Sequence, residues 1–333
     1  MDAIEVTPFG PFAVESFPVF QRTYSGSVTN YDEVNMKKRR LLFLSAGTTA
    51  AFTASLYNGL DCLRVRWQVC SHGQPNGTLV DFATNIIKTE GFVNGLWRPG
   101  IAANGIAMGV SGALRFGYYE IVRDALHADD GEEKNGAKMA LAGLSCGAVA
   151  YFVTTPFHLL KTMIQAEKGI IGPNGLYLNG LRMGKAPHVT GLFSGMKKVV
   201  AENGILGLWR GCVPLTARGA TFTAGQLVGY DGFKTLCKSS GIEDGPKLHA
   251  VSGVVAAACA TLTATPADYT MSRFMSSHET SVAVIVKQIY KEGGITGFWK
   301  GSTINFCRSA PVFLTYTAVY EQLRHYFGLG YFG

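Results

Sequence analysis

The sequence predicts an all-α membrane protein of six transmembrane helices, in three tandem pseudosymmetric repeats of two spans plus a short surface helix. Three observations lead to this prediction: few charged residues, a motif that occurs three times, and apolar segments that come in three pairs. Only 16% of the 333 residues are charged and 47% are hydrophobic, whereas soluble globular proteins carry about 25% charged residues. The composition therefore favours a membrane environment.

The repeats are defined by a tryptophan motif that occurs as EGFVNGLWRPG, ENGILGLWRG and EGGITGFWKG. The three tryptophans, Trp97, Trp209 and Trp299, lie 112 and 90 residues apart, and each follows a glutamate by seven residues. Recurrence at this spacing indicates a triplicated unit of roughly 100 residues. The predicted division is an N-terminal extension, residues 1–36, followed by repeats at residues 37–130, 131–241 and 242–333.

Each repeat contains two apolar segments of the length that a transmembrane helix needs, about 20 residues. The first segments, residues 41–60, 139–160 and 248–267, contain no charge, and Gly143-x-x-x-Gly147 and Gly253-x-x-x-Ala257 within them predict close helix packing. The second segments, residues 101–122, 212–233 and 302–323, each contain one arginine. Amphipathic stretches between the two segments, residues 81–88, 192–201 and 282–290, predict short helices along the membrane surface.

Composition narrows the classes of partner and function. The net charge of +7 and the pI near 9.0 predict anionic partners, either acidic lipid headgroups or an anionic solute. The basic residues form no nucleic-acid-binding motif, so no nucleic acid is expected. The seven cysteines include no C-x-x-C pair, which argues against a metal site and a disulfide framework. No nucleophile–base set or phosphate-binding loop appears, so an enzyme is the least favoured class and no cofactor is expected.

A second motif ends the first span of each repeat: GLDCLRVRWQ from Gly59, PFHLLKTMIQ from Pro156 and PADYTMSRFM from Pro266. Together with the tryptophan motifs, these strings resemble the signature of the mitochondrial carrier family, over residues 41–326. The resemblance implies six tilted helices with threefold pseudosymmetry around a central cavity, in the inner mitochondrial membrane. It also implies solute transport by alternating access, in which two rings of salt bridges close opposite ends of the cavity.

The ring at the cytoplasmic end is predicted from a third signature, twenty residues after each motif glycine. A tyrosine and an acidic residue are followed, three positions later, by a basic residue. These nine residues are Tyr119, Glu120, Arg123, Tyr230, Asp231, Lys234, Tyr320, Glu321 and Arg324. The resemblance implies a cytoplasmic gate that pairs the acidic residue of each repeat with the basic residue of the next, with the tyrosines as braces.

The ring at the matrix end departs from the family pattern in one of its three pairs. The resemblance implies an ion pair of Asp61 with Lys161, and another of Asp268 with Arg64. The third pair is lost because His158 stands at the acidic position and Met271 at the basic one. Gln68 and Gln165 match the glutamine braces of the family, but Met275 does not, and Gly59 replaces the first helix-kinking proline. A weakened matrix gate is therefore predicted.

The substrate site is predicted seven residues after each motif glycine, where the family places its contacts. Those positions are Ala107, Arg218 and Arg308, and Asn104 and Gly219 are expected to line the same space. A charge at mid-membrane is costly and usually faces a cavity. Two guanidinium groups at one depth suit a carboxylate or a phosphate. The alternative is that these arginines bind backbone carbonyls or lipid phosphate. Arg115 is a further candidate contact, in a segment that resembles the second helix of di- and tricarboxylate-type carriers.

The tryptophan motifs also predict lipid sites. Each motif stands just before a helix, whose N-terminal amides and dipole attract phosphate. The resemblance implies cardiolipin as the bound lipid. The predicted residues are Trp97, Arg98, Gly100, Trp209, Arg210, Gly211, Trp299, Lys300 and Gly301. The alternative is that the tryptophans merely mark the membrane interface.

Two functions remain open. The favoured one is a carrier for a small, carboxylate-type anion. The other is a carrier-fold protein that serves as a structural or accessory subunit of a larger inner-membrane assembly, with transport reduced or lost. The irregular matrix gate and an N-terminal arm suited to contact a protein partner favour the second, whereas the complete cytoplasmic signature and the paired Arg218 and Arg308 favour the first.

Overall fold

The structure, a computed structural model, describes residues 28–70, 78–125, 136–241, 246–277 and 279–328. The α-helices are α2 (Val28–Leu56), α3 (Asn58–Cys70), α4 (Leu79–Glu90), α5 (Ile101–Ala125), α6 (Gly136–Glu167), α7 (Leu192–Asn203), α8 (Cys212–Ser239), α9 (Pro246–Ser276), α10 (Val282–Gly293) and α11 (Ser302–Tyr326). One-turn helices end at each tryptophan: η2 (Val93–Trp97), η3 (Ile205–Trp209) and η4 (Thr296–Trp299).

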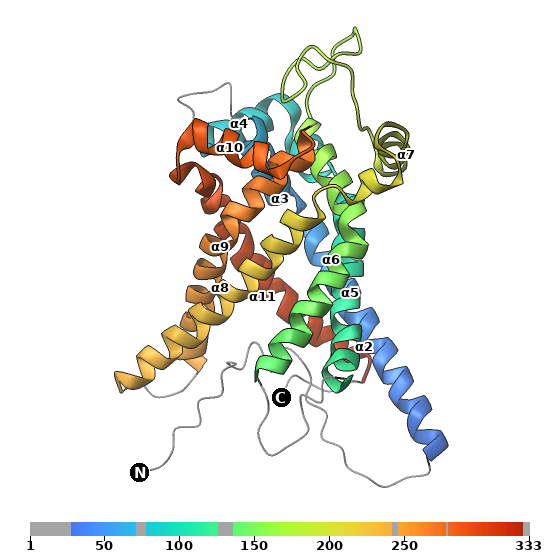
Figure 1. The fold of residues 1–333 in the computed structure, drawn as a ribbon, viewed down its shortest axis with the longest axis vertical. Helices are drawn as coiled ribbons and strands as arrows, with labels where there is room; N and C mark the ends of the chain where they lie inside the picture. The colour runs from blue at the N-terminus through green and yellow to red at the C-terminus, as the bar shows by residue number, and fades with distance from the viewer. Residues whose placement is uncertain (1–27, 71–77, 126–135, 242–245, 278, 329–333) are drawn as a thin grey trace.

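The long helices form a closed ring. Helix α2 packs on α5, α5 on α6, α6 on α8, α8 on α9, α9 on α11, and α11 returns to α2. The short helices α4, α7 and α10 lie at the end of this bundle that holds α3 (Figure 1). Near that end α3, α6 and α9 also contact one another. Helices α3, α6 and α9 therefore meet at the bundle axis, at the end that carries the short helices.

Hydropathy identifies fewer spans than the fold suggests. Among the described residues, only Leu141–Glu167 is both long enough and apolar enough for a membrane span, with a mean hydropathy of 1.2. The remaining long helices carry threonines, glycines and inward-facing charges, which lower their mean hydropathy. The six predicted spans accordingly stay a proposal, as do the exact repeat boundaries.

The second motif places a proline or a helix break in the first span of each repeat. Pro156 lies inside α6 and Pro266 inside α9, where proline removes a helical hydrogen bond and favours a kink. Gly59 stands at this place in the first repeat, and there the helix divides into α2 and α3. The Asn58 side chain stabilises the break, because its amide donates to the carbonyls of Trp97, at 2.6 Å, and Pro99, at 2.9 Å. Helix α2 begins at Val28, inside the segment predicted as an extension.

The prediction that Gly143, Gly147 and Gly253 mediate close helix packing is wrong. A Cβ atom on Gly143, Gly147 or Gly253 meets nothing within 4 Å among the described residues. The close approaches are made by α5 on α2 and by α8 on α9. A Cβ on Gly112 comes within 3.0 Å of the Ala50 Cβ, and one on Gly229 within 3.0 Å of the Ala256 Cα. Spacing places two glycines on one helix face, but it does not determine whether that face meets a neighbour.

Candidate functional site

A buried ion-pair network lies where α3, α6 and α9 converge. Lys161 of α6 contacts Asp61, and Arg64 contacts Asp268 of α9. Arg64 also donates to the Asp61 carboxylate at 3.0 Å, which joins the two pairs. All four side chains are more than nine-tenths buried. Both predicted ion pairs are therefore present, whereas their role as a gate stays a proposal.

The two predicted substrate arginines belong to the same network. The Nε atom of Arg218, from α8, lies 2.6 Å from Oδ1 of Asp268, and Nε of Arg308, from α11, lies 3.9 Å from Oδ1 of Asp61. The side chains of Arg218 and Arg308 are 18% and 17% exposed, which is more than any side chain of the two buried pairs. Arg308 also donates to the Asn305 carboxamide at 3.4 Å. The two guanidinium groups thus lie within 4 Å of the Asp268 and Asp61 carboxylates, while part of each side chain remains accessible.

The network carries more positive than negative charge. Its cations are Arg64, Lys161, Arg218 and Arg308, and its anions are Asp61 and Asp268. The excess is two positive charges among side chains that are mostly withdrawn from water. Burying charge without compensation is costly, so this arrangement favours the binding of an anion.

The other three residues predicted to line the substrate site pack against neighbouring helices. The Asn104 amide donates to the Asn58 side chain at 2.9 Å and to the Ala54 carbonyl at 3.2 Å. Ala107 is fully buried. Gly219 is buried against Tyr151, whose ring a Cβ at this position would overlap. In this conformation the three residues join neighbouring helices, and their role in lining a cavity stays a prediction.

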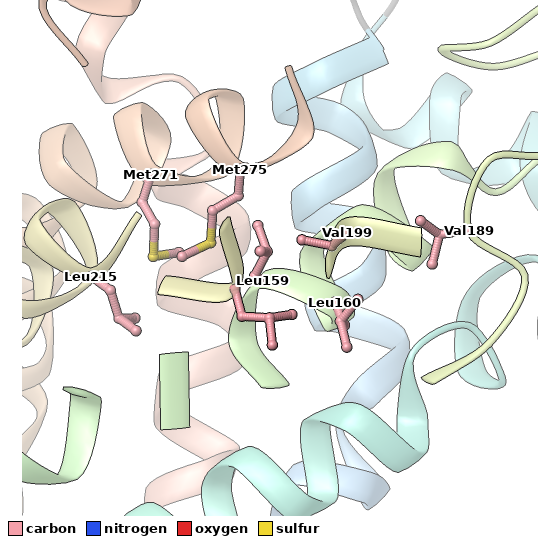
Figure 2. Close-up of a cluster of buried hydrophobic side chains, with 8 residues drawn as sticks. Leu159, Leu160, Val189, Val199, Leu215, Met271 and Met275 are labelled. Atoms are coloured by element: carbon pink, nitrogen blue, oxygen red, sulfur yellow. The ribbon is translucent and has the colours of Figure 1, made fainter. Parts of the chain in front are cut away.

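The third edge of the matrix ring is closed by apolar side chains. Met271 and Met275 of α9 belong to a buried cluster in which Leu159 of α6 and Leu215 of α8 also take part. Figure 2 shows the two methionines extending from α9 toward Leu215 and Leu159. Met271 carries no charge, so it forms no ion pair with His158. Methionine packing takes its place, and a weaker gate stays a prediction.

The glycines of the tryptophan motifs lie against the three brace positions in a threefold pattern. Gly100, Gly211 and Gly301 have φ of 69°, 87° and 87°, which favours glycine over any other residue. Their neighbours are the braces of the following repeats. A Cβ on Gly100 comes within 3.1 Å of Gln165, one on Gly211 within 2.6 Å of Met275, and one on Gly301 within 3.1 Å of Gln68. Met275 therefore stands where the other two repeats have a brace glutamine, and it contacts the motif glycine through apolar packing.

The predicted lipid-site residues lie at this end of the bundle. Trp97 and Trp299 are exposed, at 37% and 40%. The indole of Trp299 donates to the Leu262 carbonyl and that of Trp209 to the Phe152 carbonyl, both at 2.9 Å. The Arg98 side chain is exposed. Arg210 differs, because it donates to the carbonyls of Phe274, at 3.0 Å, and Glu279, at 2.5 Å, and so holds the end of α9.

In the first and third repeats an arginine of the second motif pairs with the glutamate of the tryptophan motif, and sequence analysis missed this contact, which we call the clasp. Arg66 forms a bidentate pair with Glu90 at 2.7 and 2.8 Å, and Arg273 forms one with Glu292 at 2.5 and 3.1 Å. The signal was available, because both arginines stand two residues before a brace position and both glutamates seven residues before a tryptophan. The second repeat has Met163 at the arginine position.

In that repeat the loop at residues 168–191 supplies the partner instead. His188 Nε2 lies 2.9 Å from the Glu202 carboxylate, and its Nδ1 lies 3.4 Å from Glu167. Glu167 in turn accepts the backbone amides of His188 and Val189, at 3.3 and 3.1 Å. Asn179 reaches the first repeat and donates to Glu90 at 3.1 Å. The loop rises beyond the short helices (Figure 1), so it is built into the clasps of two repeats.

The predicted cytoplasmic gate is only partly visible. The side chains of Tyr119, Glu120, Arg123, Asp231 and Glu321 lie outside the described residues. Tyr230, Tyr320 and Arg324 are buried, and the Arg324 guanidinium lies 5.8 Å from the centre of the Tyr320 ring. Lys234 is half-buried. The three predicted pairs each require an acidic side chain from the undescribed set, so they stay predictions.

Comparison with known proteins identifies the family. The sequence profile described as "Mitochondrial carrier protein" matches residues 40–130, 132–241 and 244–330. The mitochondrial substrate carrier family protein ucpB of Dictyostelium discoideum is 28% identical over 91% of this chain and 99% of its own length. The probable mitochondrial 2-oxoglutarate/malate carrier protein of the same organism is 28% identical, over 84% of this chain and 88% of that protein. Mitochondrial brown fat uncoupling protein 1 of Ovis aries is 30% identical over 84% and 90%. The chain therefore belongs to the mitochondrial carrier family and is a multi-pass transport protein of the inner mitochondrial membrane.

Proposed function

We propose that this carrier moves a small carboxylate-type anion by alternating access, with Arg218 and Arg308 as its substrate contacts. The observation that carries the proposal is the excess of two positive charges in the buried network. A guanidinium group binds a carboxylate in bidentate fashion, and these two arginines are the partly accessible members of the network. One relative is named as a probable 2-oxoglutarate/malate carrier, which supports a carboxylate over other anions.

The conformation is best interpreted as one that is closed toward the matrix. We assign the end with α4, α7 and α10 to the matrix side, and we assign α2 with α3, α5, α6, α8, α9 and α11 to six membrane spans. Contacts among α3, α6 and α9, together with the ion-pair network, close that end. Opposite it, the cytoplasmic gate would form from Glu120, Asp231 and Glu321 with the basic residues of the neighbouring repeats.

The geometry couples substrate binding directly to this closure. Arg218 contacts Asp268, and Arg308 lies close to Asp61. An anion that takes both guanidinium groups withdraws two cations from these carboxylates. The remaining pairs, Arg64 with Asp268 and Lys161 with Asp61, then hold the matrix end with less electrostatic support. A ligand shifts a conformational equilibrium only through its differential affinity for the two states, and here the shared arginines provide that difference.

A thermal-shift screen of the purified protein tests the proposal. The panel contains di-, tri- and ketocarboxylates, inorganic phosphate and nucleotides, because a solute that binds only the folded state raises the melting temperature by mass action. We expect a carboxylate to give the largest shift, and Arg218→Ala and Arg308→Ala to abolish it. These variants lower the buried excess charge, so they are expected to fold. Arg40→Ala, at an exposed position on α2, is the matched control. A carboxylate shift that survives both Arg218→Ala and Arg308→Ala overturns the assignment.

Cardiolipin binding at the tryptophan motifs is a second part of the proposal. Its support is the exposure of Trp97, Arg98 and Trp299 beside the first turns of α5 and α11. Helix N-termini attract phosphate groups. Stabilisation by added cardiolipin is expected to fall in Arg98→Ala and Lys300→Ala but to persist in Arg40→Ala, a change at an exposed position on α2. Equal stabilisation of all three variants contradicts this placement.

The loop at residues 168–191 supports the alternative of an accessory subunit. Its side chains Ile171, Leu178 and Met183 are exposed although apolar, and exposed apolar groups often mark protein contacts. Mild detergent extraction distinguishes the two functions. A carrier runs mainly alone and responds to solutes, whereas a subunit runs in a fixed stoichiometry with partners and gives no solute-induced shift.

A further inference from the structure

We propose that Asn58 is a positioning residue of the transport cycle, which holds Gln165 of the second repeat and so keeps the first two repeats together at the end that carries the short helices. The inference rests on the proposed assignment of this end to the matrix side. It goes beyond that assignment, because it adds an uncharged contact that has to separate during opening. Its starting point is the residue that directly precedes Gly59, where the first repeat lacks the proline of the other two.

The Asn58 side chain is fully buried, and its carboxamide uses both N–H groups and both lone pairs of its oxygen. The amide donates to the carbonyls of Trp97, at 2.6 Å, and Pro99, at 2.9 Å. The oxygen accepts from the amides of Asn104, at 2.9 Å, and Gln165, at 3.1 Å. Backbone carbonyls only accept hydrogen bonds, so they determine which end of the carboxamide faces the other two partners. Asn58 thus connects α3 to the tryptophan motif, to α5 and to α6.

The equivalent residues of the other repeats bond to their own helices. Thr155 and Thr265 directly precede the prolines of α6 and α9, and both are fully buried. Each hydroxyl donates to the carbonyl four residues earlier in the same helix, at 2.6 Å. The Asn58 amide instead donates to carbonyls of another segment, at the point where α2 ends and α3 begins. Hydrogen bonds between segments therefore hold the helix break of the first repeat, whereas a proline ring disrupts the helix in the other two.

The contact with Gln165 joins two repeats beside an ion pair. Gln165 lies four residues after Lys161 on α6, and Asp61 lies three residues after Asn58 on α3. Lys161 contacts Asp61, so one charged and one uncharged pair of side chains join the same two helices. Both pairs have to separate when α3 and α6 move apart at this end.

The two pairs respond differently to a bound anion. An anion on Arg218 and Arg308 reduces the electrostatic support of the pair of Asp61 with Lys161, as proposed above. The pair of Asn58 with Gln165 carries no charge, so the anion leaves it unchanged. A neutral hydrogen bond shifts an equilibrium by about 2- to 10-fold. Asn58 therefore contributes a part of the closure that is the same with and without the anion.

The residues equivalent to Gln165 have different partners on the other two edges. Gln68 donates to Asp268 at 3.4 Å and to the Lys300 carbonyl at 3.3 Å, and Met275 packs against Gly211. Methionine at this position is thus compatible with the fold. The change Gln165→Met accordingly removes the contact with Asn58 and keeps a side chain of similar length.

Thiol labelling at position 166 tests the proposal, because Ala166 is fully buried in a cluster with Val65 and Val69 of α3. The full chain with Ala166→Cys is treated with N-ethylmaleimide in detergent, and mass spectrometry of its peptides gives a rate for each cysteine. The rate at position 166 reports how often α3 and α6 separate. We expect it to rise about 2- to 10-fold when Asn58→Thr or Gln165→Met is added. The double variant should label no faster than Asn58→Thr alone, because both changes remove the same contact.

Two controls distinguish this role from a general loosening of the fold. Thr265→Val changes the equivalent, equally buried position of the third repeat, and it should leave the rate at position 166 unchanged. Cys146 is buried on the same helix as Ala166, and its rate should stay the same in every variant. Asn58→Thr together with Gly59→Pro, the pair of residues found in the other two repeats, serves if the single variant fails to fold.

The outcomes separate this proposal from the proposed function. An unchanged rate in Gln165→Met, additive effects of the two changes, or an equal rise at Cys146 or in Thr265→Val overturns the role of Asn58. Malate, added as the probe anion, should raise the rate at position 166 by the same factor with and without Asn58→Thr, and a different factor overturns the independence of this contact from the anion. Absence of an effect of malate and of every other carboxylate in the panel, with the effects of Asn58→Thr and Gln165→Met intact, contradicts the proposed anion and leaves the role of Asn58 in place.

Discussion

Glu90 and Glu292 occupy the same position of the tryptophan motif, yet the structure predicts that replacing them has very different effects on stability. Each accepts a bidentate pair from an arginine of the preceding helix. The Arg66 and Glu90 side chains are each 3% exposed, whereas the Glu292 side chain is 41% exposed. Sequence symmetry predicts equal effects, and burial predicts unequal ones.

The magnitude follows from that burial. Glu90→Gln leaves the Arg66 guanidinium buried without its anionic partner, which typically costs about 3–5 kcal/mol. The same variant also disturbs the amide of Asn179, which donates to Glu90 at 3.1 Å. Glu292→Gln removes a pair that is largely open to solvent, for which the typical loss is about 0–1 kcal/mol. We therefore expect the first variant to be less stable than the second by at least about 2 kcal/mol.

Thiol exposure provides the assay, because Cys62, Cys146 and Cys237 are buried in the folded chain. Apparent melting temperatures are compared at one scan rate with a thiol-reactive dye, so that irreversible unfolding affects all variants alike. The double variant Arg66→Met with Glu90→Gln removes both charges, and methionine occupies the arginine position in the second repeat. It should recover most of the loss. The reasoning is refuted if Glu292→Gln is as destabilising as Glu90→Gln.

Three further predictions concern the same end of the bundle. Gly211→Ala is expected to destabilise the chain by more than Gly301→Ala: both glycines have φ 87° and ψ 9°, which costs about 1–2 kcal/mol for alanine, but a Cβ on Gly211 comes within 2.6 Å of Met275 whereas one on Gly301 comes within 3.1 Å of Gln68. Met271→Lys should destabilise, and a double-mutant cycle with His158→Asp should show a favourable coupling of about 0.5–3 kcal/mol; zero coupling means that the two positions do not face each other. Arg210→Ala should lower the melting temperature with or without added cardiolipin, because this side chain donates to the Phe274 carbonyl; an effect seen only with lipid contradicts that role.

Symmetry explains why sequence predicted the ion pairs of the matrix ring. In a triplicated chain, residues at one motif position lie at one level, and the resemblance to the family implied which of them pair: Asp61 with Lys161, and Arg64 with Asp268. Symmetry does not determine which partner a long side chain contacts among the residues at the same depth of the bundle. Arg218 and Arg308 were predicted as free substrate contacts, but they lie beside Asp268 and Asp61. That choice depends on the local balance of charge, which emerges only once all helices are in place.

Departures from symmetry were visible in sequence, but the contacts that compensate for them were not. The losses at His158 and Met271 are apparent from alignment of the motifs. The apolar cluster that fills this edge draws Leu159, Leu215 and Val189 from two helices and a loop. Likewise, His188 replaces a missing arginine from a loop position that no repeat pattern predicts. Compensation of this kind comes from tertiary contacts between segments, and spacing within a repeat does not record it.

The departures at His158, Met271 and Met275 fall on the edge between the second and third repeats, and this has a consequence for opening. On the other two edges, ion pairs join the helices at the end that we assign to the matrix, and their carboxylates lie within 4 Å of the proposed substrate arginines. On this edge Met271 and Met275 take the place of an ion pair and a glutamine brace. Methionine side chains are flexible and adapt to altered packing, so helices can slide past one another here without breaking a charged contact. We therefore expect an anion on Arg218 and Arg308 to release the two charged edges first, while the methionine edge stays packed and acts as the hinge.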